Sequence, residues 1–378
     1  MFARFLVWVT VARTVTAMLP VGLFFAAAAD PLAASNPIAL ASAITLGTGL
    51  ALWPSGRLLD RIGRWRGIRA CLSIAAGSLL LVGAGVVASW PVAVLAVVAV
   101  AAGALLAPLV AAPRTVVPQL VPPSRLVWAS GVEASSFEVA LIIAPVLAAM
   151  VGRFGTATVL VTAGGALLAV RVAFPRPSGA DHGLVGNGPV LAWPVVGLAG
   201  LAALLGASGG MLEPALAQLA PPVVRLPGSN VLLFVAVGLG SFAGGLLAAR
   251  ATWPTRAGHA APLFALHAAA LVATAAVPGA LQLVTLAVAG LSIAPLTSLA
   301  GLHLDRWAPA HRVGETYGII TGVLLVGTAI GQAVAARALA YVPPDALVLW
   351  AAVPAGAAAL FVARRGDGRP PGDRPPQA

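Results

Sequence analysis

The chain alternates between long apolar runs and short polar stretches. Most runs extend over about 20 residues, the length that an α-helix needs to cross the hydrocarbon core of a membrane. Charged residues, Pro and Gly separate the runs and set the limits of the predicted spans. These twelve spans cover residues 5–29, 37–55, 68–88, 91–112, 126–151, 155–175, 191–216, 228–249, 260–278, 280–303, 313–337 and 345–363. We therefore expect an all-α membrane protein with twelve transmembrane helices.

The composition agrees with a membrane environment. Of the 378 residues, 60% are hydrophobic and only 9% are charged, and the mean hydropathy is +0.98. A soluble domain carries about 25% charged residues, because water must wet its surface. This composition argues against a soluble enzyme and against an intrinsically disordered protein. The single cysteine, Cys71, cannot form a disulfide within the chain, which argues against a disulfide-rich secreted scaffold.

The formal net charge of +11 comes from 22 basic residues, all of which are Arg. If the N-terminus is cytoplasmic, 18 of the 22 lie on the cytoplasmic side, and three (Arg153, Arg225 and Arg337) lie on the opposite side. This asymmetry predicts that both termini are cytoplasmic. The basic charge then indicates topology and contact with membrane lipids, not nucleic-acid binding. The absence of Lys is typical of a GC-rich genome, so we expect a bacterial inner membrane.

A repeated pattern divides the chain into two halves. Ala107-Pro108-Leu109 matches Ala294-Pro295-Leu296, and in both copies an Arg follows 17 residues after the Pro, at Arg125 and Arg312. Spans 4 and 5 would then recur as spans 10 and 11. We expect an N-terminal six-helix bundle (1–175), a cytoplasmic linker (176–190), a C-terminal six-helix bundle (191–363) and a disordered cytoplasmic tail (364–378). Parallel repeats with a substrate site between them are a known transporter architecture.

The most specific motif lies in the predicted loop between spans 2 and 3. Residues 56–66 read G-x-x-x-D-R-x-G-R-x-R, with Gly56, Asp60, Arg61, Gly63 and Arg64 at the defining positions. A basic cytoplasmic loop would explain the Arg residues, but neither the two Gly residues nor the Asp. The pattern resembles the signature loop of the major facilitator superfamily, and with twelve spans in two halves the resemblance covers the whole chain. It implies two six-helix bundles that move a small molecule by alternating access.

The resemblance also implies a role for this loop. In the family, the loop is thought to lock the cytoplasmic ends of the two halves together when the cavity opens outward. Here the start of span 11 would face the loop, and Glu315 is the candidate partner for Arg61 or Arg64. The glycines would allow a tight turn, and the guanidinium groups would offer donors to a carboxylate.

Span 5 carries small residues at helical spacing. Ala140, Ala144, Pro145 and Ala148 are similar to the family's antiporter motif G-x-x-x-G-P-x-x-G-G, with each glycine replaced by alanine. Spans 8 and 11 hold the related pairs Gly240-x-x-x-Gly244 and Gly327-x-x-x-Gly331. Because the family places spans 2, 5, 8 and 11 between the halves, these residues would form sliding contacts there. Ordinary small-residue packing is the alternative. The span 5 motif favours export.

Ionisable side chains inside a membrane are costly and mark candidate functional positions. Arg13 lies in span 1, Glu133 and Glu138 lie in span 5, and Glu213 lies near the outer end of span 7. Glu133 is at a depth similar to that of Arg13, which predicts an ion pair. Glu138 is nearest the membrane midplane and is predicted to exchange protons, whereas Glu213 is either a charge site or an interfacial residue. His267 in span 9 is expected to be packed or lipid-facing, not a proton relay.

By family analogy, spans 1, 4, 7 and 10 line a central cavity. Their polar side chains are sparse: Thr10, Thr14, Ser208, Ser292, Thr297 and Ser298. Such a cavity suits a hydrophobic or amphipathic small molecule better than a sugar, which needs many hydrogen-bond partners. We expect a monomeric secondary transporter that exports its substrate in exchange for protons, with no cofactor, no metal and no enzyme activity.

Two alternatives stay open. The alanine-substituted motif of span 5 is compatible with uptake or facilitated exchange of a small metabolite. Drug–proton antiporters of the family usually carry an Arg near the start of span 4, and residues 91–112 contain no charged residue. A regulatory relative that has lost transport is therefore the second alternative.

Overall fold

The computed structural model describes residues 2–30, 35–122, 125–174, 193–219, 230–250, 260–307 and 313–365. Every regular element in these ranges is an α-helix. The helices are α1 (Phe2–Ala29), α2 (Ser35–Ile62), α3 (Arg64–Val87), α4 (Val92–Leu120), α5 (Leu126–Gly152), α6 (Thr156–Ala173), α7 (Trp193–Gln218), α8 (Val231–Arg250), α9 (Ala260–Ala276), α10 (Leu281–Gly290), α11 (Ile293–Trp307), α12 (Val313–Ala338) and α13 (Pro344–Arg365). The predicted linker at 176–190, and the predicted tail beyond residue 365, lie outside the described residues.

The helices have the length and apolarity of membrane spans. Ten segments of the described residues are long and apolar enough to cross a membrane, and one of them, Leu281–Leu304, consists of α10 followed by α11. Two shorter apolar helical segments, Val139–Gly152 and Ala260–Ala276, accompany them. Many large apolar side chains, such as Val97, Val172 and Val353, are exposed. The protein is an all-helical membrane protein, because only lipid can cover so much apolar surface.

Several helices depart from the predicted spans. Predicted span 10 is interrupted at Leu291 and Ser292, between α10 and α11. Predicted spans 2 and 4 ended at residues 55 and 112, whereas α2 continues to Ile62 and α4 continues to Leu120. The reason is that hydropathy reports where the hydrocarbon ends, while backbone hydrogen bonding can extend a helix beyond that point.

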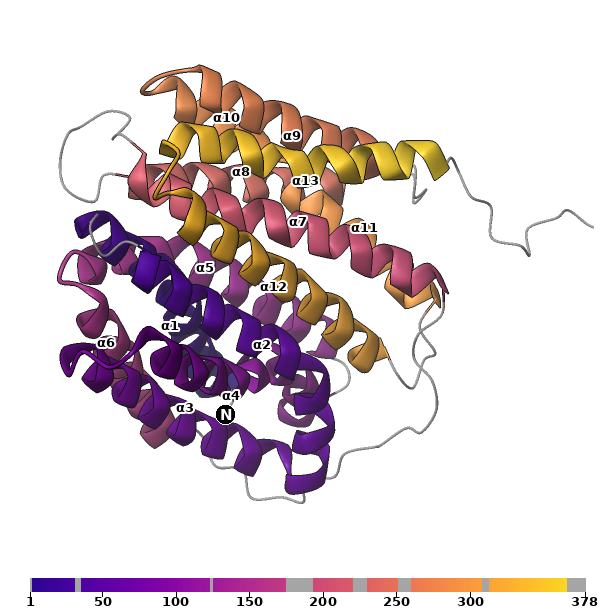
Figure 1. The fold of residues 1–378 in the computed structure, drawn as a ribbon. Helices are drawn as coiled ribbons and strands as arrows, with labels where there is room; N and C mark the ends of the chain where they lie inside the picture. Colours follow the sequence, from indigo (N-terminus) through magenta and orange to yellow (C-terminus); the bar gives the residue numbers. More distant parts are fainter. Residues whose placement is uncertain are drawn as a thin grey trace, which may run out of the picture.

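Helices α1–α6 are called the first group here and α7–α13 the second, and Figure 1 shows the two sets on opposite sides of the structure. In the first group, α1 packs on α5 and α6, α2 packs on α4, and α3 packs on α4 and α6. In the second, α7 packs on α12 and α13, α9 packs on α13 and α10, and α8 packs on α10 and α11. The main contacts between the groups join α2 to α12, α1 to α7 and α5 to α8.

The contact between α2 and α12 is close enough for direct backbone approach. A Cβ atom on Gly49 of α2 would lie 2.8 Å from the carbonyl oxygen of Gly322, and one on Gly322 would lie 2.7 Å from that of Gly49. Ser42 of α2 also donates a hydrogen bond of 2.8 Å to the carbonyl oxygen of Ala329 in α12. Glycine is needed at both positions because any side chain would separate the helices.

Candidate functional site

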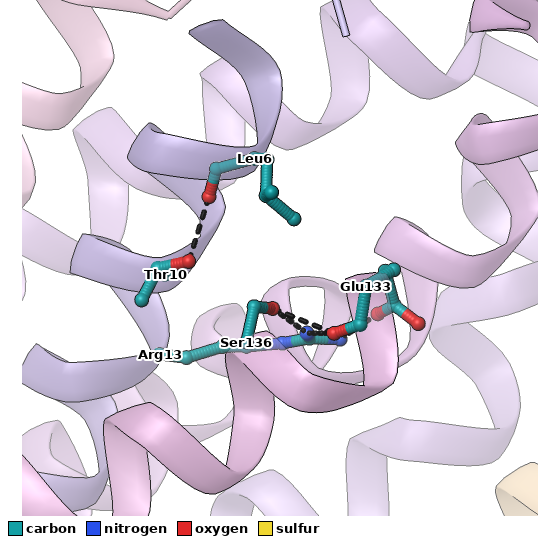
Figure 2. Close-up of polar contacts among 5 residues, drawn as sticks. All are labelled: Leu6, Thr10, Arg13, Glu133 and Ser136. Atoms are coloured by element: carbon teal, nitrogen blue, oxygen red, sulfur yellow. Dashed lines mark hydrogen bonds and ion pairs between the residues drawn. The ribbon is translucent and has the colours of Figure 1, made fainter. Parts of the chain in front are cut away.

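A buried ion pair joins α1 to α5. The guanidinium of Arg13 forms an ion pair with the carboxylate of Glu133, and their side chains are 6% and 3% exposed. Nη1 of Arg13 also donates to Ser136 Oγ at 2.9 Å and to the carbonyl oxygen of Glu133 at 3.1 Å (Figure 2). The Ser136 hydroxyl in turn donates to the same carbonyl at 2.6 Å. The structure therefore brings Arg13 and Glu133 together and adds Ser136, which the sequence analysis did not identify.

Small residues of α5 bring it close to α1 beside this pair. Ala140, Ala144 and Ala148 are buried and recur every four residues, so they lie on one face of the helix. Gly152 continues this face, and a Cβ atom there would lie 2.6 Å from the carbonyl oxygen of Gly22 in α1. Gly152 thus lies against α1, and the three buried alanines precede it at four-residue intervals along α5. Pro145 lies inside α5 next to this face.

The polar groups of α1 near Arg13 are largely satisfied within their own helix. Thr10 donates to the carbonyl oxygen of Leu6 at 2.8 Å (Figure 2), and Thr14 donates to that of Thr10 at 2.9 Å. Their hydroxyl hydrogens are therefore used locally, and only the oxygen lone pairs are left to accept. Arg13 and Glu133 together carry no net charge, which lowers the cost of holding two charges inside the membrane.

A second acidic side chain lies between α7 and α12. Glu213 of α7 has Gln332 of α12 as its polar neighbour. Gln332 is only 1% exposed, and no hydrogen bond of standard geometry joins its amide to a described group, although Glu213 lies near enough to interact with it. Burying an amide without a well-formed hydrogen bond costs free energy, so the Gln332 amide favours a closer contact with the Glu213 carboxyl group or with another polar group.

Glycines on α7 and α12 interlock beside Glu213. A Cβ atom on Gly206 or Gly210 would lie 2.0 or 2.1 Å from a carbonyl oxygen of α12, and one on Gly327 or Gly331 would lie 2.2 or 2.4 Å from a carbonyl oxygen of α7. The expectation that the Gly327–Gly331 pair forms a sliding contact between the halves is therefore wrong. These glycines face α7, a helix of their own group, and lie where the backbones of α7 and α12 approach each other closely.

The Gly240–Gly244 pair is also misassigned by the sequence analysis. Cβ atoms at these positions would lie 2.0 and 2.1 Å from the carbonyl oxygens of Ala287 and Leu291. Both oxygens belong to the region where α10 ends, again within the second group. The carbonyl oxygen of Leu291 cannot accept the usual helical hydrogen bond from residue 295, because that residue is Pro295, which has no N–H to donate. Among the glycines that the structure describes, the closest contact between the groups is instead that of Gly49 with Gly322.

Comparison with known proteins places this architecture among solved transporters. No family model and no curated protein matches the sequence. Among solved structures, a bacterial homologue of the human lysosomal transporter Spinster, in an inward-facing and occupied conformation, shares 14% identity with a TM-score of 0.69, covering 95% of this chain and 96% of that one. The human organic anion transporter MFSD10 shares 15% sequence identity with a TM-score of 0.63, and the match covers 96% of this chain and 99% of that one. A peptide transporter, POT, in complex with sulfate shares 12% sequence identity with a TM-score of 0.69, and the match covers 96% of this chain and 94% of that one.

The match extends over nearly the whole length of each chain. The protein has the major facilitator fold. The similar solved proteins are transporters, which are not enzymes. At this level of identity the likeness establishes the fold alone, so the roles of individual residues depend on the geometry of this chain.

Within the major facilitator fold, the signature segment differs from the loop predicted for it. Residues up to Ile62 continue α2 as a helix, and α3 begins at Arg64. The single connecting residue is Gly63, with φ of 87°, a left-handed conformation that glycine adopts without strain. The prediction of a loop over residues 56–66 is therefore wrong, because Leu58, Leu59 and Arg61 are good helix formers. The side chains of Asp60, Arg61 and Arg64, and the surroundings of Gly56, lie outside the described residues.

Glu315 has a partner that the sequence analysis did not predict. It lies in the first turn of α12, and its Oε1 accepts a hydrogen bond of 2.7 Å from Nε1 of Trp53 in α2. This bond joins the two groups at the end of α2 near the signature segment. Trp53 is 45% exposed, and its position near the end of a predicted span suggests only a membrane anchor. No feature of the sequence distinguishes it from the other tryptophans near span ends.

The proton-exchange candidate Glu138 is in α5, but its side chain lies outside the described residues. Two of the predicted cavity residues, Ser208 and Ser292, have no exposed surface and form hydrogen bonds within the second group. They therefore do not face an open cavity in this conformation. No group of three or more His, Cys, Asp or Glu side chains in the described residues could hold a metal ion.

Proposed function

We propose that this protein is a secondary active transporter that moves a small molecule across a bacterial inner membrane by alternating access. The observation that carries the proposal is the major facilitator fold, shared with solved transporters over almost all of the chain. In this proposal, residues 1–175 and 191–363 are two six-helix bundles joined by a cytoplasmic linker at 176–190, and both termini are cytoplasmic. The contacts of α2 with α12 and of α5 with α8 are then the places where the bundles separate and close.

We further propose proton-coupled export of a hydrophobic or amphipathic molecule. The few hydroxyl groups expected along the transport path favour such a substrate, because a sugar would leave its hydrogen-bonding groups unpaired. Glu138 and Glu213 are the proposed proton-binding groups, since Glu133 is paired with Arg13. The neighbouring Gln332, whose buried amide lies beside the Glu213 carboxyl group, supports Glu213 in particular.

Retention of fluorescent lipophilic dyes in efflux-deficient cells tests this proposal. Wild type, Asp60→Asn, Glu138→Gln and Glu213→Gln are compared with and without a protonophore. Asp345→Asn, an acid-to-amide change at an exposed position in the first turn of α13, serves as the matched control. We expect wild type and the control to lower dye retention, the protonophore to abolish this effect, and the other three variants to abolish it without a protonophore.

Two results would contradict the export proposal. Dye accumulation above that of empty cells would indicate uptake. Export that persists with the protonophore present would exclude proton coupling, and export that persists in both Glu138→Gln and Glu213→Gln would remove these residues as the coupling groups.

The contact between α2 and α12 gives a separate prediction. Because a Cβ atom on Gly322 would lie 2.7 Å from the Gly49 carbonyl oxygen, Gly322→Ala should weaken this contact by about 1–3 kcal/mol. Gly318→Ala, one turn earlier on α12, is the control, since its Cβ atom would meet its nearest neighbour at an ordinary 3.6 Å. Distances between spin labels on α2 and α12, measured with Cys71 replaced by Ser, should lengthen in Gly322→Ala only. Equal distances in both variants would show that the contact does not depend on close backbone approach.

A further inference from the structure

A buried histidine lies at the interruption between α10 and α11. His267 of α9 is 2% exposed. Its Nδ1 is 3.0 Å from the carbonyl oxygen of Ala289 and 3.1 Å from Oγ of Ser292. On the opposite edge of the ring, Nε2 is 3.4 Å from Oγ of Ser208 in α7. The imidazole therefore links α9 to the α10–α11 interruption and to α7.

The hydrogen atoms around the ring can be assigned from their partners. Ser292 Oγ donates to the carbonyl oxygen of Ala289 at 2.7 Å, and Ser208 Oγ donates to that of Ala351 in α13 at 2.6 Å. A hydroxyl has one hydrogen to donate, so both serines present lone pairs to the ring. Both nitrogens of His267 thus face acceptors. A neutral imidazole has one N–H and satisfies only one edge, whereas an imidazolium donates from both edges.

We propose that His267 is a proton-binding site that couples protonation to the contact of α9 with α7 and with the α10–α11 interruption. In the neutral ring, Nδ1 carries the hydrogen, and the lone pair of Nε2 faces the oxygen of Ser208 without a donor between them. Addition of a proton at Nε2 creates a hydrogen bond to Ser208 and draws α9 toward α7. This site is distinct from Glu138 and Glu213, and it does not depend on the substrate or on the direction of transport.

The described groups that surround the His267 ring are polar, and none of those within hydrogen-bonding distance is charged. Helices α10, α11 and α13 pack on α9, and α7 contributes Ser208. From these helices, the described groups that contact the ring are two hydroxyls and the Ala289 carbonyl. Other described titratable side chains of these helices are Glu213 of α7, His303 of α11, and Asp345 and Arg364 of α13, and no hydrogen bond joins any of them to the ring. The protonated ring would therefore be stabilised by nearby water and by these acceptors. The fraction of His267 that carries the second proton then depends on how the surrounding helices are arranged.

The repeated segment indicates why the proton would act on helix geometry. Helix α4 runs without interruption through Ala107-Pro108-Leu109, whereas its matching copy is interrupted just before Pro295. The residue that corresponds to Ser292 in the first copy is Leu105, which cannot bond to a carbonyl. In a continuous helix, the carbonyl of Ala289 would accept from the N–H of residue 293. Here it accepts from Ser292 and lies within hydrogen-bonding distance of His267.

Nitrogen NMR of ¹⁵N-histidine-labelled protein in lipid nanodiscs tests the proposal directly. The chain has five His residues, and the signal lost in His267→Gln assigns the ring. We expect hydrogen on Nδ1 alone at about pH 8 and on both nitrogens at about pH 4, a range that includes the ordinary titration of histidine. Since Ser208 Oγ bonds only to the protonated form, Ser208→Ala should lower the pH of half-protonation by about one unit.

Thr285→Ala is the matched control, because this hydroxyl of α10 bonds to Thr274 and to its own helix and not to His267. It should leave the titration of the ring unchanged. A ring that stays neutral throughout this pH range, a neutral form with hydrogen on Nε2, or an equal shift in both variants would overturn the proposal. The titration requires no transport, so it gives a result even if the export experiment fails.

Discussion

Replacing Arg13 with Met is expected to destabilise the protein by about 3–5 kcal/mol, because it leaves the carboxylate of Glu133 charged, buried and unpaired. Glu133→Leu should cost a similar amount, since the guanidinium would then lose its ion pair. Both side chains are almost fully buried between α1 and α5, so water cannot replace the missing partner. Thermal unfolding in detergent, followed by the fraction of protein that remains monodisperse, measures the effect.

The double variant Arg13→Met/Glu133→Leu distinguishes an ion pair from ordinary packing. Removal of both charges eliminates the unpaired partner, so most of the lost stability should return. Arg153→Met is the control, because this Arg lies at the end of the same helix α5 and is exposed. Loss of stability in the double variant equal to the sum of the two single losses would contradict the assignment of a coupled pair. If the double variant is stable but does not export dye, the pair has a function beyond stability.

Gly210→Ala should be among the most damaging single-methyl substitutions in α7. The new Cβ atom would lie 2.1 Å from the carbonyl oxygen of Thr328, and neither backbone can yield without separating α7 from α12. Overpacking of this kind costs about 1–3 kcal/mol, and a clash with backbone lies at the upper end of that range. The separation would also displace Gln332 from Glu213. We expect a lower unfolding temperature together with loss of export.

The neighbouring residue provides a closely matched comparison. Gly209→Ala makes the same chemical change one residue earlier, where no atom lies within 4 Å of the new Cβ atom. Alanine is a better helix former than glycine by about 1 kcal/mol, so this variant should be as stable as wild type or slightly more stable. Similar unfolding temperatures for the two variants would show that α7 and α12 are not held by close backbone contact.

Much of the fold could be predicted from the sequence because a membrane helix satisfies its own backbone hydrogen bonds. Its presence therefore depends on local composition. Predicted spans 9 and 11, at 260–278 and 313–337, lie within two residues of α9 and α12. The ends were less predictable where a helix leaves the hydrocarbon, as α2 and α4 do.

The candidate site could be predicted only where depth in the membrane limits the choice of partner. Arg13 and Glu133 were matched because two opposite charges at similar depth have few alternatives inside hydrocarbon. The contact of Glu315 with Trp53 could not be found in this way, because many donors are available near the membrane surface. The structure gives Trp53 as one donor to Glu315, and the Trp53 indole N–H is not distinguished by any motif.

The sequence by itself determined that this protein is a bundle of membrane helices, that its charge is concentrated at helix ends, and that a few ionisable groups lie inside the membrane. The tertiary structure alone decided which helix each small residue faces and where a helix is interrupted. Gly240 and Gly327 each begin a G-x-x-x-G pattern of the kind expected at a contact between the halves. Both nevertheless pack against helices of their own group. The A-P-L segment is continuous in α4 and follows an interruption in its second copy, because there Ser292 and His267 approach the Ala289 carbonyl. Such choices depend on neighbours distant in the sequence, which a local pattern does not contain.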